Sequence, residues 1–392
     1  MGAPLTVCLV LLAILLGAGF ALDEGDSGAT SAAERSAPIA VIERRVEQIR
    51  ELKFRTLPRP QTVTPAQAKR EGLADFDRSY PPARRRADEE VLKLLGLLEP
   101  DVDLRGVSAS IFGQAVAGYY DPRNGRLRVV EGAQTASRVL NEITLAHELT
   151  HALEDQRFEL ALDSGSTDDA ALARLAFVEG TAMLVMQEYL LRHIGTEQAL
   201  SGLLGSAFST GPDLPKFLQD QLIFPYLDGM QFAQALREQD GGGWTLLDLA
   251  ARERVPESTE QILHPEKWVE IEQPDQVTLD VDLGPGWRRT ARGTWGEWQT
   301  GALIGGDAAG WGGDRYELWQ RGTCAAAPCR SEDVLIMRWL WDTLDDAREF
   351  EAALRAAPVA NGDGAAVSSR AEAVTLVLAP SAALARRLSA SA

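Results

Sequence analysis

Histidine, cysteine and basic side chains are scarce in this 392-residue sequence. It contains four His, three Cys, and 39 Lys and Arg against 57 Asp and Glu. The resulting net charge of -18 repels phosphate backbones and leaves no basic stripe on which they could dock. The composition therefore argues against nucleic-acid binding. No repeat of fixed period is present, and the length predicts two domains.

The three cysteines are too few for a disulfide framework. Cys8 lies in the N-terminal apolar run, and no small residue precedes it as a lipid attachment site would require. Cys324 and Cys329 bracket the stretch RGTCAAAPCR, which predicts a small disulfide-closed loop in an exported chain. Two cysteines without a nearby histidine make a weak case for a metal site.

The N-terminus predicts export. An apolar run from Pro4 to Ala21 is followed at once by acidic residues, which is typical of a signal peptide over residues 1–21 and a location in the cell envelope or outside the cell. The usual basic segment is missing and the run is just long enough to span a bilayer, so an uncleaved membrane anchor stays open. Residues 22–36 are small, polar and acidic, which predicts a disordered linker.

Apolar periodicity predicts the elements before residue 270. Helical spacing of apolar residues indicates an amphipathic helix between Ala37 and Phe54. Residues 113–132, GQAVAGYYDPRNGRLRVVEG, predict a hairpin around a turn-forming cluster. One helix should start at Asn141 and run to Phe158. A second should start after Thr167 and stop at Gly195.

All nine tryptophans lie at or after Trp244, which favours a domain boundary near residue 270. Residues 276–283, 315–321, 334–341 and 373–379 predict strands, and Asp342 or Thr343 should open a helix. The predicted fold class is α+β: a zincin-like, mainly helical catalytic domain with a small sheet over residues 37–270, then an α+β domain over residues 271–392. The tryptophans are expected to be core residues, although stacking on sugar rings is an alternative.

Residues 146–156, AHELTHALEDQ, contain two of the four histidines. On a helix, His147 and His151 stack one turn apart on one face, so that their imidazoles can converge on one point. With histidine this rare, a chance match to H-E-x-x-H has a probability of roughly 0.003. The alternative is a core helix with two hydrogen-bonded histidines.

Glu179 interrupts an apolar stripe on the second helix, and a buried carboxylate is costly unless it is paired or holds a metal. Two imidazoles and one carboxylate predict a single catalytic Zn²⁺ at His147, His151 and Glu179. Glu148 is then placed to take a proton from an attacking water and hand it to a leaving amine.

The stretches LAHELTHAL and FVEGTA resemble the gluzincin, or thermolysin-like, metallopeptidases. This resemblance implies that His147, His151 and Glu179 bind zinc and that Glu148 is the general base or acid. The family has an aspartate four residues after the glutamate ligand, whereas this chain has Met183. Asp155 and Asp121 are alternative candidates for orienting the ligands, or are ordinary surface and turn acids.

The chain also resembles a group of exported bacterial proteins that combine HExxH with VEG, FPYxxGxxF, ILHPEK and AGWGGDR. These motifs occur here between about residues 85 and 350. The run AGWGGDRYELW lacks the pattern of a nucleotide loop and is interpreted as a tight turn, whose Asp314 and Arg315 join the domains or border the cleft.

Tyr226 and then His264 are the candidate oxyanion donors, since both lie beside proline in segments expected to be loops. A core tyrosine and a packing histidine are the alternatives. By the gluzincin resemblance, residues 116–120 form an edge strand that binds substrate backbone, with an interior strand as the alternative.

These features predict an exported zinc metallopeptidase that acts on polypeptides. A catalytically silent zinc-binding envelope protein and a hydrolase of cell-wall peptide or glycan are the alternatives. The sequence leaves the oligomeric state open, and it predicts membrane contact only through the N-terminal segment.

Overall fold

The computed structural model describes residues 37–114, 118–131, 138–160, 167–194, 214–322 and 327–391. The predicted signal peptide, the linker, Gly195 and Cys324 lie outside these ranges. The disulfide between Cys324 and Cys329 therefore stays a prediction. Within the described ranges, no helix combines the length and hydropathy needed to cross a membrane.

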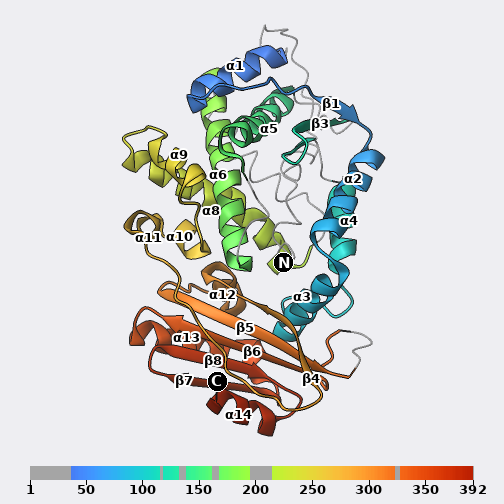
Figure 1. The fold of residues 1–392 in the computed structure, drawn as a ribbon, viewed down its shortest axis with the longest axis vertical. Helices are drawn as coiled ribbons and strands as arrows, with labels where there is room; N and C mark the ends of the chain where they lie inside the picture. Colours follow the sequence, from blue (N-terminus) through green and yellow to red (C-terminus); the bar gives the residue numbers. More distant parts are fainter. Residues whose placement is uncertain are drawn as a thin grey trace, which may run out of the picture.

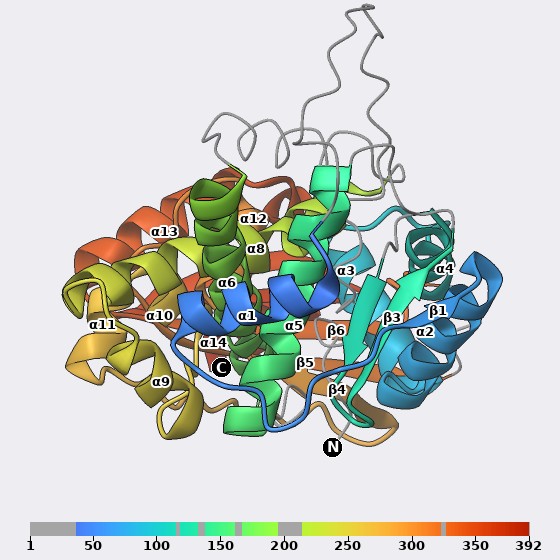
Figure 2. The ribbon, with the colours of Figure 1, turned by 90° about the horizontal axis from the view of Figure 1, so that it is seen from above.

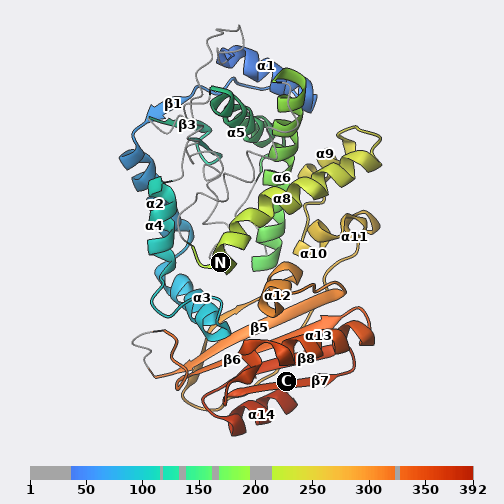
Figure 3. The ribbon, with the colours of Figure 1, turned by 180° about the vertical axis from the view of Figure 1, so that it is seen from behind.

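Helices dominate the chain before residue 271. In order they are α1 (Ile39–Arg50), α2 (Pro65–Ser79), α3 (Pro82–Leu95), α4 (Leu104–Gln114), α5 (Arg138–Phe158), α6 (Asp168–His193), α8 (Lys216–Gln239), α9 (Thr245–Arg252), α10 (Thr259–Leu263) and α11 (Pro265–Glu270). The start of α6 is set locally, because the Thr167 side chain accepts a hydrogen bond from the Ala170 N–H. Figures 1 and 3 show α1 at one end of the molecule and a five-stranded sheet at the other.

A three-stranded sheet lies against these helices. β1 (Gln61–Val63) is parallel to β3 (Arg126–Val130), and β3 is antiparallel to β2 (Gly118–Asp121). The strand order β1-β3-β2 leaves β2 at an edge. In Figure 2 the sheet lies between α5 and α2.

Helices α6 and α8 cross at two glycines. A Cβ added to Gly180 would lie 2.0 Å from the backbone of Gly229, and one added to Gly229 would lie 2.0 Å from the backbone of Ala176. Since Glu188, further along α6, meets Arg237, further along α8, the two helices run in the same direction. Only glycine permits this contact between backbones.

The C-terminal part is a five-stranded antiparallel sheet of order β4-β5-β6-β8-β7. Its elements are β4 (Trp287–Gly293), α12 (Glu297–Ile304), β5 (Trp311–Arg321), β6 (Asp333–Trp341), α13 (Leu344–Ala356), a 3₁₀ turn (Pro358–Asn361), β7 (Ala365–Arg370), β8 (Ala373–Leu378) and α14 (Ala382–Ser391). The fold class is therefore α+β, as predicted.

Alternating side chains of β6 separate the two faces of this sheet. Met337 and Trp339 join a core shared with α3, α12 and α13, where Trp339 lies 4.9 Å from Phe350 between ring centroids. Val334 and Ile336 face the other way and pack under α14. One face of the sheet therefore packs against the helical part.

Several predicted elements are confirmed and others are wrong. The N-terminal helix, the hairpin, the helix after Thr167 and the strands at 315–321, 334–341 and 373–379 are present, and Thr343 caps α13. Residues 276–283 form no strand. The histidine helix begins at Arg138, so Asn141 lies inside it rather than at its cap. Six of the nine tryptophans are buried, namely Trp244, Trp268, Trp295, Trp311, Trp339 and Trp341.

Candidate metal centre

His147 and His151 lie on the same face of α5. Their rings meet edge to face with centroids 4.6 Å apart, and their Nε2 atoms are 2.9 Å apart. Ala146, Leu149 and Leu153 are fully buried on the helix, which fixes the direction in which it faces. The expected convergence of the two imidazoles is therefore present.

Glu179 reaches the same point from α6. Its Oε2 atom lies 3.3 Å from the Nε2 atom of His147 and 3.3 Å from that of His151. The side chains of Glu179 and His147 are 2% and 1% exposed, whereas that of His151 is 12% exposed. The cluster is thus buried, with His151 on its more open side.

The spacing of these three atoms is close to that around a tetrahedral ion: two separations are 3.3 Å, and the third, between the two imidazole nitrogens, is 2.9 Å. Ligand atoms about 2.05 Å from a tetrahedral zinc lie about 3.3 Å from one another. In addition, Glu179 Oε2 is buried and has no hydrogen-bond partner among the described residues. A buried carboxylate oxygen without a donor is costly. A cation at this point would supply the missing partner, so the residues fit a metal.

Burial and nearby charges together set the protonation of the cluster. It lowers the pKa of His147 well below the usual value, and the nearby His151 lowers it further. Burial also favours a neutral His151, but the negative charges of Glu179, Glu148 and Glu154 outweigh it and raise that pKa to about 9. Burial raises the pKa of Glu148 to about 7, and the charge of Glu179 adds to the rise. A group that titrates near neutrality suits general acid–base chemistry.

Glu148 is held against the edge strand β2. Its carboxylate accepts a hydrogen bond from the backbone N–H of Tyr120, while its Oε1 atom has no partner among the described residues. The Tyr120 hydroxyl donates to Asp155 on α5, with 2.8 Å between the oxygens. Strand β2 is therefore held beside α5 by two groups of Tyr120, its backbone N–H and its hydroxyl.

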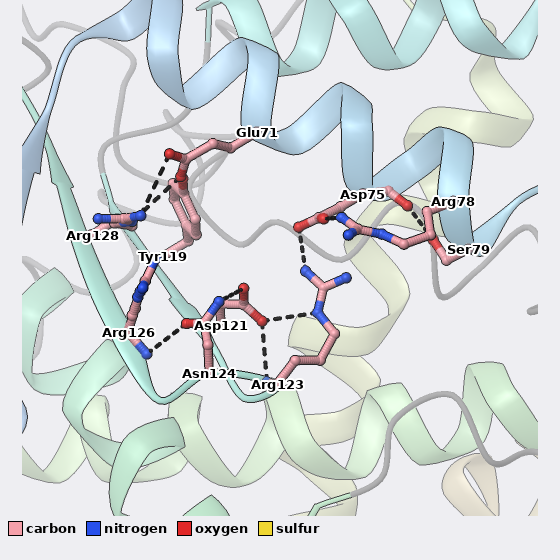
Figure 4. A network of polar contacts seen from close by, with 10 residues as sticks. All are labelled: Glu71, Asp75, Arg78, Ser79, Tyr119, Asp121, Arg123, Asn124, Arg126 and Arg128. Atoms are coloured by element: carbon pink, nitrogen blue, oxygen red, sulfur yellow. Dashed lines mark hydrogen bonds and ion pairs between the residues drawn. The ribbon is translucent and has the colours of Figure 1, made fainter.

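A polar network fastens the outer side of the same hairpin to α2 (Figure 4). The Tyr119 hydroxyl donates to Glu71 at 2.6 Å, and Arg128 pairs with Glu71 at 3.3 Å. At the turn, Arg123 bridges Asp121 and Asp75. Within the described residues β2 is an edge strand, which favours the predicted edge strand over the interior alternative at residues 118–120.

The structure brings Tyr226 to the cluster, on a helix rather than a loop. Tyr226 lies inside α8, directly after Pro225, and is 6% exposed. Burial raises its pKa well above the usual value, and the charges of Glu179 and Glu148 raise it further. The loop prediction failed because Pro225 is tolerated within α8.

His264 has other partners. It joins α10 to α11, and its Nε2 atom lies 2.9 Å from Glu297 Oε1. The hydrogen bond to Glu297 raises its pKa. These contacts favour the packing alternative for His264 and do not support a role as oxyanion donor.

The structure assigns different tasks to the remaining acids. Asp121 bonds Arg123 and Asn124 within the hairpin turn, so it is a turn acid. Asp155 bonds Tyr120 and does not orient a ligand directly. The interpretation of AGWGGDR as a tight turn is wrong from Trp311 onward, since that residue begins β5.

The described contacts of Asp314 and Arg315 lie within the C-terminal part, so they do not support the interpretation that these two residues join the domains. Asp314 is buried and accepts hydrogen bonds from the backbone N–H groups of Trp295 and Gly296 at the start of α12, at 2.5 and 2.6 Å. The Arg315 side chain, 28% exposed, lies 3.9 Å from Glu317 on the same strand.

Two features of the site escaped sequence analysis. One is the Tyr120 N–H, which is a backbone group without a side-chain signature. The other is the α6–α8 crossing at Gly180 and Gly229, which brings the helix that carries Tyr226 against the helix that carries Glu179. The glycines in FVEGTA and FPYLDGMQF are the residues that allow this close crossing, but the sequence does not show that they contact each other.

The C-terminal part of the chain is similar to a known protein family. Residues 288–389, the part that contains the five-stranded sheet, match a family model described as a domain of unknown function (DUF8575). No curated protein matches the chain, and no solved structure does.

Proposed function

We propose that the chain is a zinc-dependent metallohydrolase of the gluzincin type that cleaves peptide bonds. The observation that carries this proposal is the buried triangle of His147 Nε2, His151 Nε2 and Glu179 Oε2, with sides of 2.9, 3.3 and 3.3 Å. Glu148, which titrates near neutrality, stands on the same helix.

His147, His151 and Glu179 would hold the ion. Bound there, it would supply a Lewis acid that polarises a carbonyl and increases the acidity of water. The Glu148 carboxylate accepts the proton of the attacking water and returns it to the leaving amine. The Tyr226 hydroxyl donates to the carbonyl oxygen as that oxygen gains charge.

Strand β2 supports a polypeptide substrate. Among the described residues no strand pairs with the outer edge of β2, and a strand edge can pair with an extended chain. Because the Tyr120 N–H also holds Glu148, a substrate strand along β2 would lie beside the proposed base. This arrangement supports peptides over the cell-wall glycan alternative.

The first test measures zinc per chain by elemental analysis. Wild type should bind one zinc, and Glu179→Ala should lose most of it, whereas Glu349→Gln on the exposed surface of α13 should keep it. Glu148→Gln should retain zinc and lose hydrolysis of an unfolded protein substrate. A wild type that stays metal-free in added zinc would reject the proposal. Hydrolysis that survives in Glu148→Gln would reject the assigned base.

A further inference from the structure

Tyr120 contacts α5 at two points. Its backbone N–H donates to the carboxylate of Glu148, and its hydroxyl donates to Asp155, with 2.8 Å between the oxygens. Glu148 and Asp155 are seven residues apart in the sequence. They therefore lie on the same face of α5, about two turns from each other, with His151 between them. One residue of the edge strand thus spans the stretch of helix that carries the proposed base and a proposed zinc ligand.

The acceptor of the Tyr120 hydroxyl is itself fixed. Asp155 is half-buried, and its carboxylate also accepts a hydrogen bond from the backbone N–H of Leu160, just beyond the end of α5. Hydrogen bonds to a carboxylate are among the strong ones, and two donors define its direction better than one. The Tyr120 hydroxyl is therefore held at a defined point of the helix.

The backbone N–H of Tyr120 is not held by the sheet. Tyr120 faces Leu127 in the register of β2 and β3. In an antiparallel pair, successive residues direct their N–H groups alternately toward the partner strand and away from it. Because the Tyr120 N–H donates to Glu148, it is one of the groups that point away from β3. Its position relative to α5 therefore depends on contacts outside the sheet, and the hydrogen bond from the Tyr120 hydroxyl to Asp155 is such a contact.

We infer that the hydrogen bond from the Tyr120 hydroxyl to Asp155 positions Glu148 for proton transfer. This inference rests on the proposed function, in which Glu148 accepts the proton of the attacking water. A base must stand within hydrogen-bonding distance of the proton that it takes, so a small change in its direction lowers the rate. Glu148 Oε1 has no partner among the described residues, so the carboxylate depends on the Tyr120 N–H for its direction. Tyr120 and Asp155 are thus positioning residues that act through Glu148.

Tyr119 provides a matched control on the same strand. Neighbouring side chains of a strand point to opposite faces of the sheet, and the Tyr119 hydroxyl donates to Glu71 on α2 at 2.6 Å (Figure 4). Tyr119→Phe and Tyr120→Phe each remove one hydrogen bond between a tyrosine and a carboxylate, and both keep the ring and the backbone N–H. If both hydroxyls only stabilise the fold, the two variants should behave alike.

The test measures zinc content, stability in urea and hydrolysis of an unfolded protein by the full chain. Tyr120→Phe should bind zinc as wild type does and lower kcat by about 10- to 100-fold, with KM within about twofold of wild type. Tyr119→Phe should lose a comparable amount of stability and keep the wild-type kcat. Equal kcat values for the two variants, or a fall in kcat that follows loss of zinc, would overturn the inference.

Asp155 supplies a second comparison. Asp155→Asn keeps an oxygen that can accept from Tyr120, whereas Asp155→Ala does not. Asp155→Asn should therefore recover most of the activity that Asp155→Ala loses, and this comparison decides the question if Tyr120→Phe does not fold. Equal activity of the two Asp155 variants would count against the inference.

The proposed function and this inference fail in different ways. A wild type that neither binds zinc nor hydrolyses protein rejects the proposed function, and the inference with it. An active wild type whose kcat is matched by Tyr120→Phe rejects the inference alone.

Discussion

At the scale of single residues, the Tyr226 hydroxyl gives the most specific prediction. Tyr226→Phe keeps the buried ring, so the free energy of unfolding and the zinc content should hardly change. Loss of an oxyanion donor should lower kcat by about a hundredfold to a thousandfold.

A tyrosine on α6 provides the matched control. Tyr189 is also buried, and its hydroxyl donates to Glu142 at 2.6 Å. Tyr189→Phe should lower stability by about 1 kcal/mol and leave kcat unchanged. Similar kcat values for both variants would remove Tyr226 from the mechanism.

The residues of the cluster show what a sequence can reveal. The spacing of His147 and His151 predicts that both lie on one face of a helix. The charge of Glu179 within an apolar stripe indicates that it needs a partner, which led to its assignment as the third ligand. His264 was a weaker inference, because its position beside proline said nothing about its distant partner Glu297. Long-range contacts of this kind have no local signal.

At the scale of elements, the α6–α8 crossing should be intolerant of added atoms. Gly229→Ala places a methyl group 2.0 Å from the Ala176 backbone, so the helices must separate. We expect the free energy of unfolding to fall by about 2–3 kcal/mol or more, and zinc affinity to fall with it because Glu179 moves.

The comparison for this variant is Gly362→Ala. A Cβ at Gly362 meets nothing within 4 Å, and its φ of -79° suits alanine. Chemical denaturation and a zinc titration should leave that variant equal to wild type. If Gly229→Ala matches it, close backbone contact does not hold the site together.

Elements were predictable where side-chain period and caps agreed. β6 and β8 are central strands with strong apolar runs, and both were found. β4 and β7 were missed because they are the sheet edges, where sequences such as WRRTARG and AAVSSR have little apolar pattern. Residues 276–283 alternate like a strand, but within the described part of the chain they pair with no strand of the sheet.

At the scale of the whole molecule, two carboxyl groups at the start of α6 bind the neighbouring parts of the fold: Asp168 binds α3 and the C-terminal sheet, and Asp169 binds α10. Asp168 at the start of α6 accepts hydrogen bonds from Arg84 on α3 and from Tyr316 on β5, at 2.6 and 3.0 Å. Its neighbour Asp169 accepts from the Thr259 N–H and hydroxyl at 3.0 and 2.6 Å. The junction therefore depends on acids that are largely removed from water.

This burial predicts how stability changes with pH. Burial raises the pKa of Asp169 from 3.8 to about 8, and that of Asp314 from 3.8 to about 7. At a pH between the unfolded and the folded pKa of either residue, the folded chain holds a proton on that carboxyl group and the unfolded chain has lost it. The stabilising contribution is complete below about pH 4 and disappears as the pH rises through the folded values. Each such group changes the free energy of unfolding by up to about 1.4 kcal/mol per pH unit in its window.

Asp169→Asn isolates one of these groups. The amide oxygen can still accept from Thr259, but the amide does not titrate. The free energy of unfolding of the variant, measured in urea, should therefore fall less than that of wild type as the pH rises from about 5 to 8. Asp345→Asn, whose side chain is 84% exposed in wild type, should follow the wild-type profile. If Asp169→Asn follows it as well, Asp169 is ionised in the folded chain at neutral pH, and the junction is held by a buried charge rather than by a protonated acid.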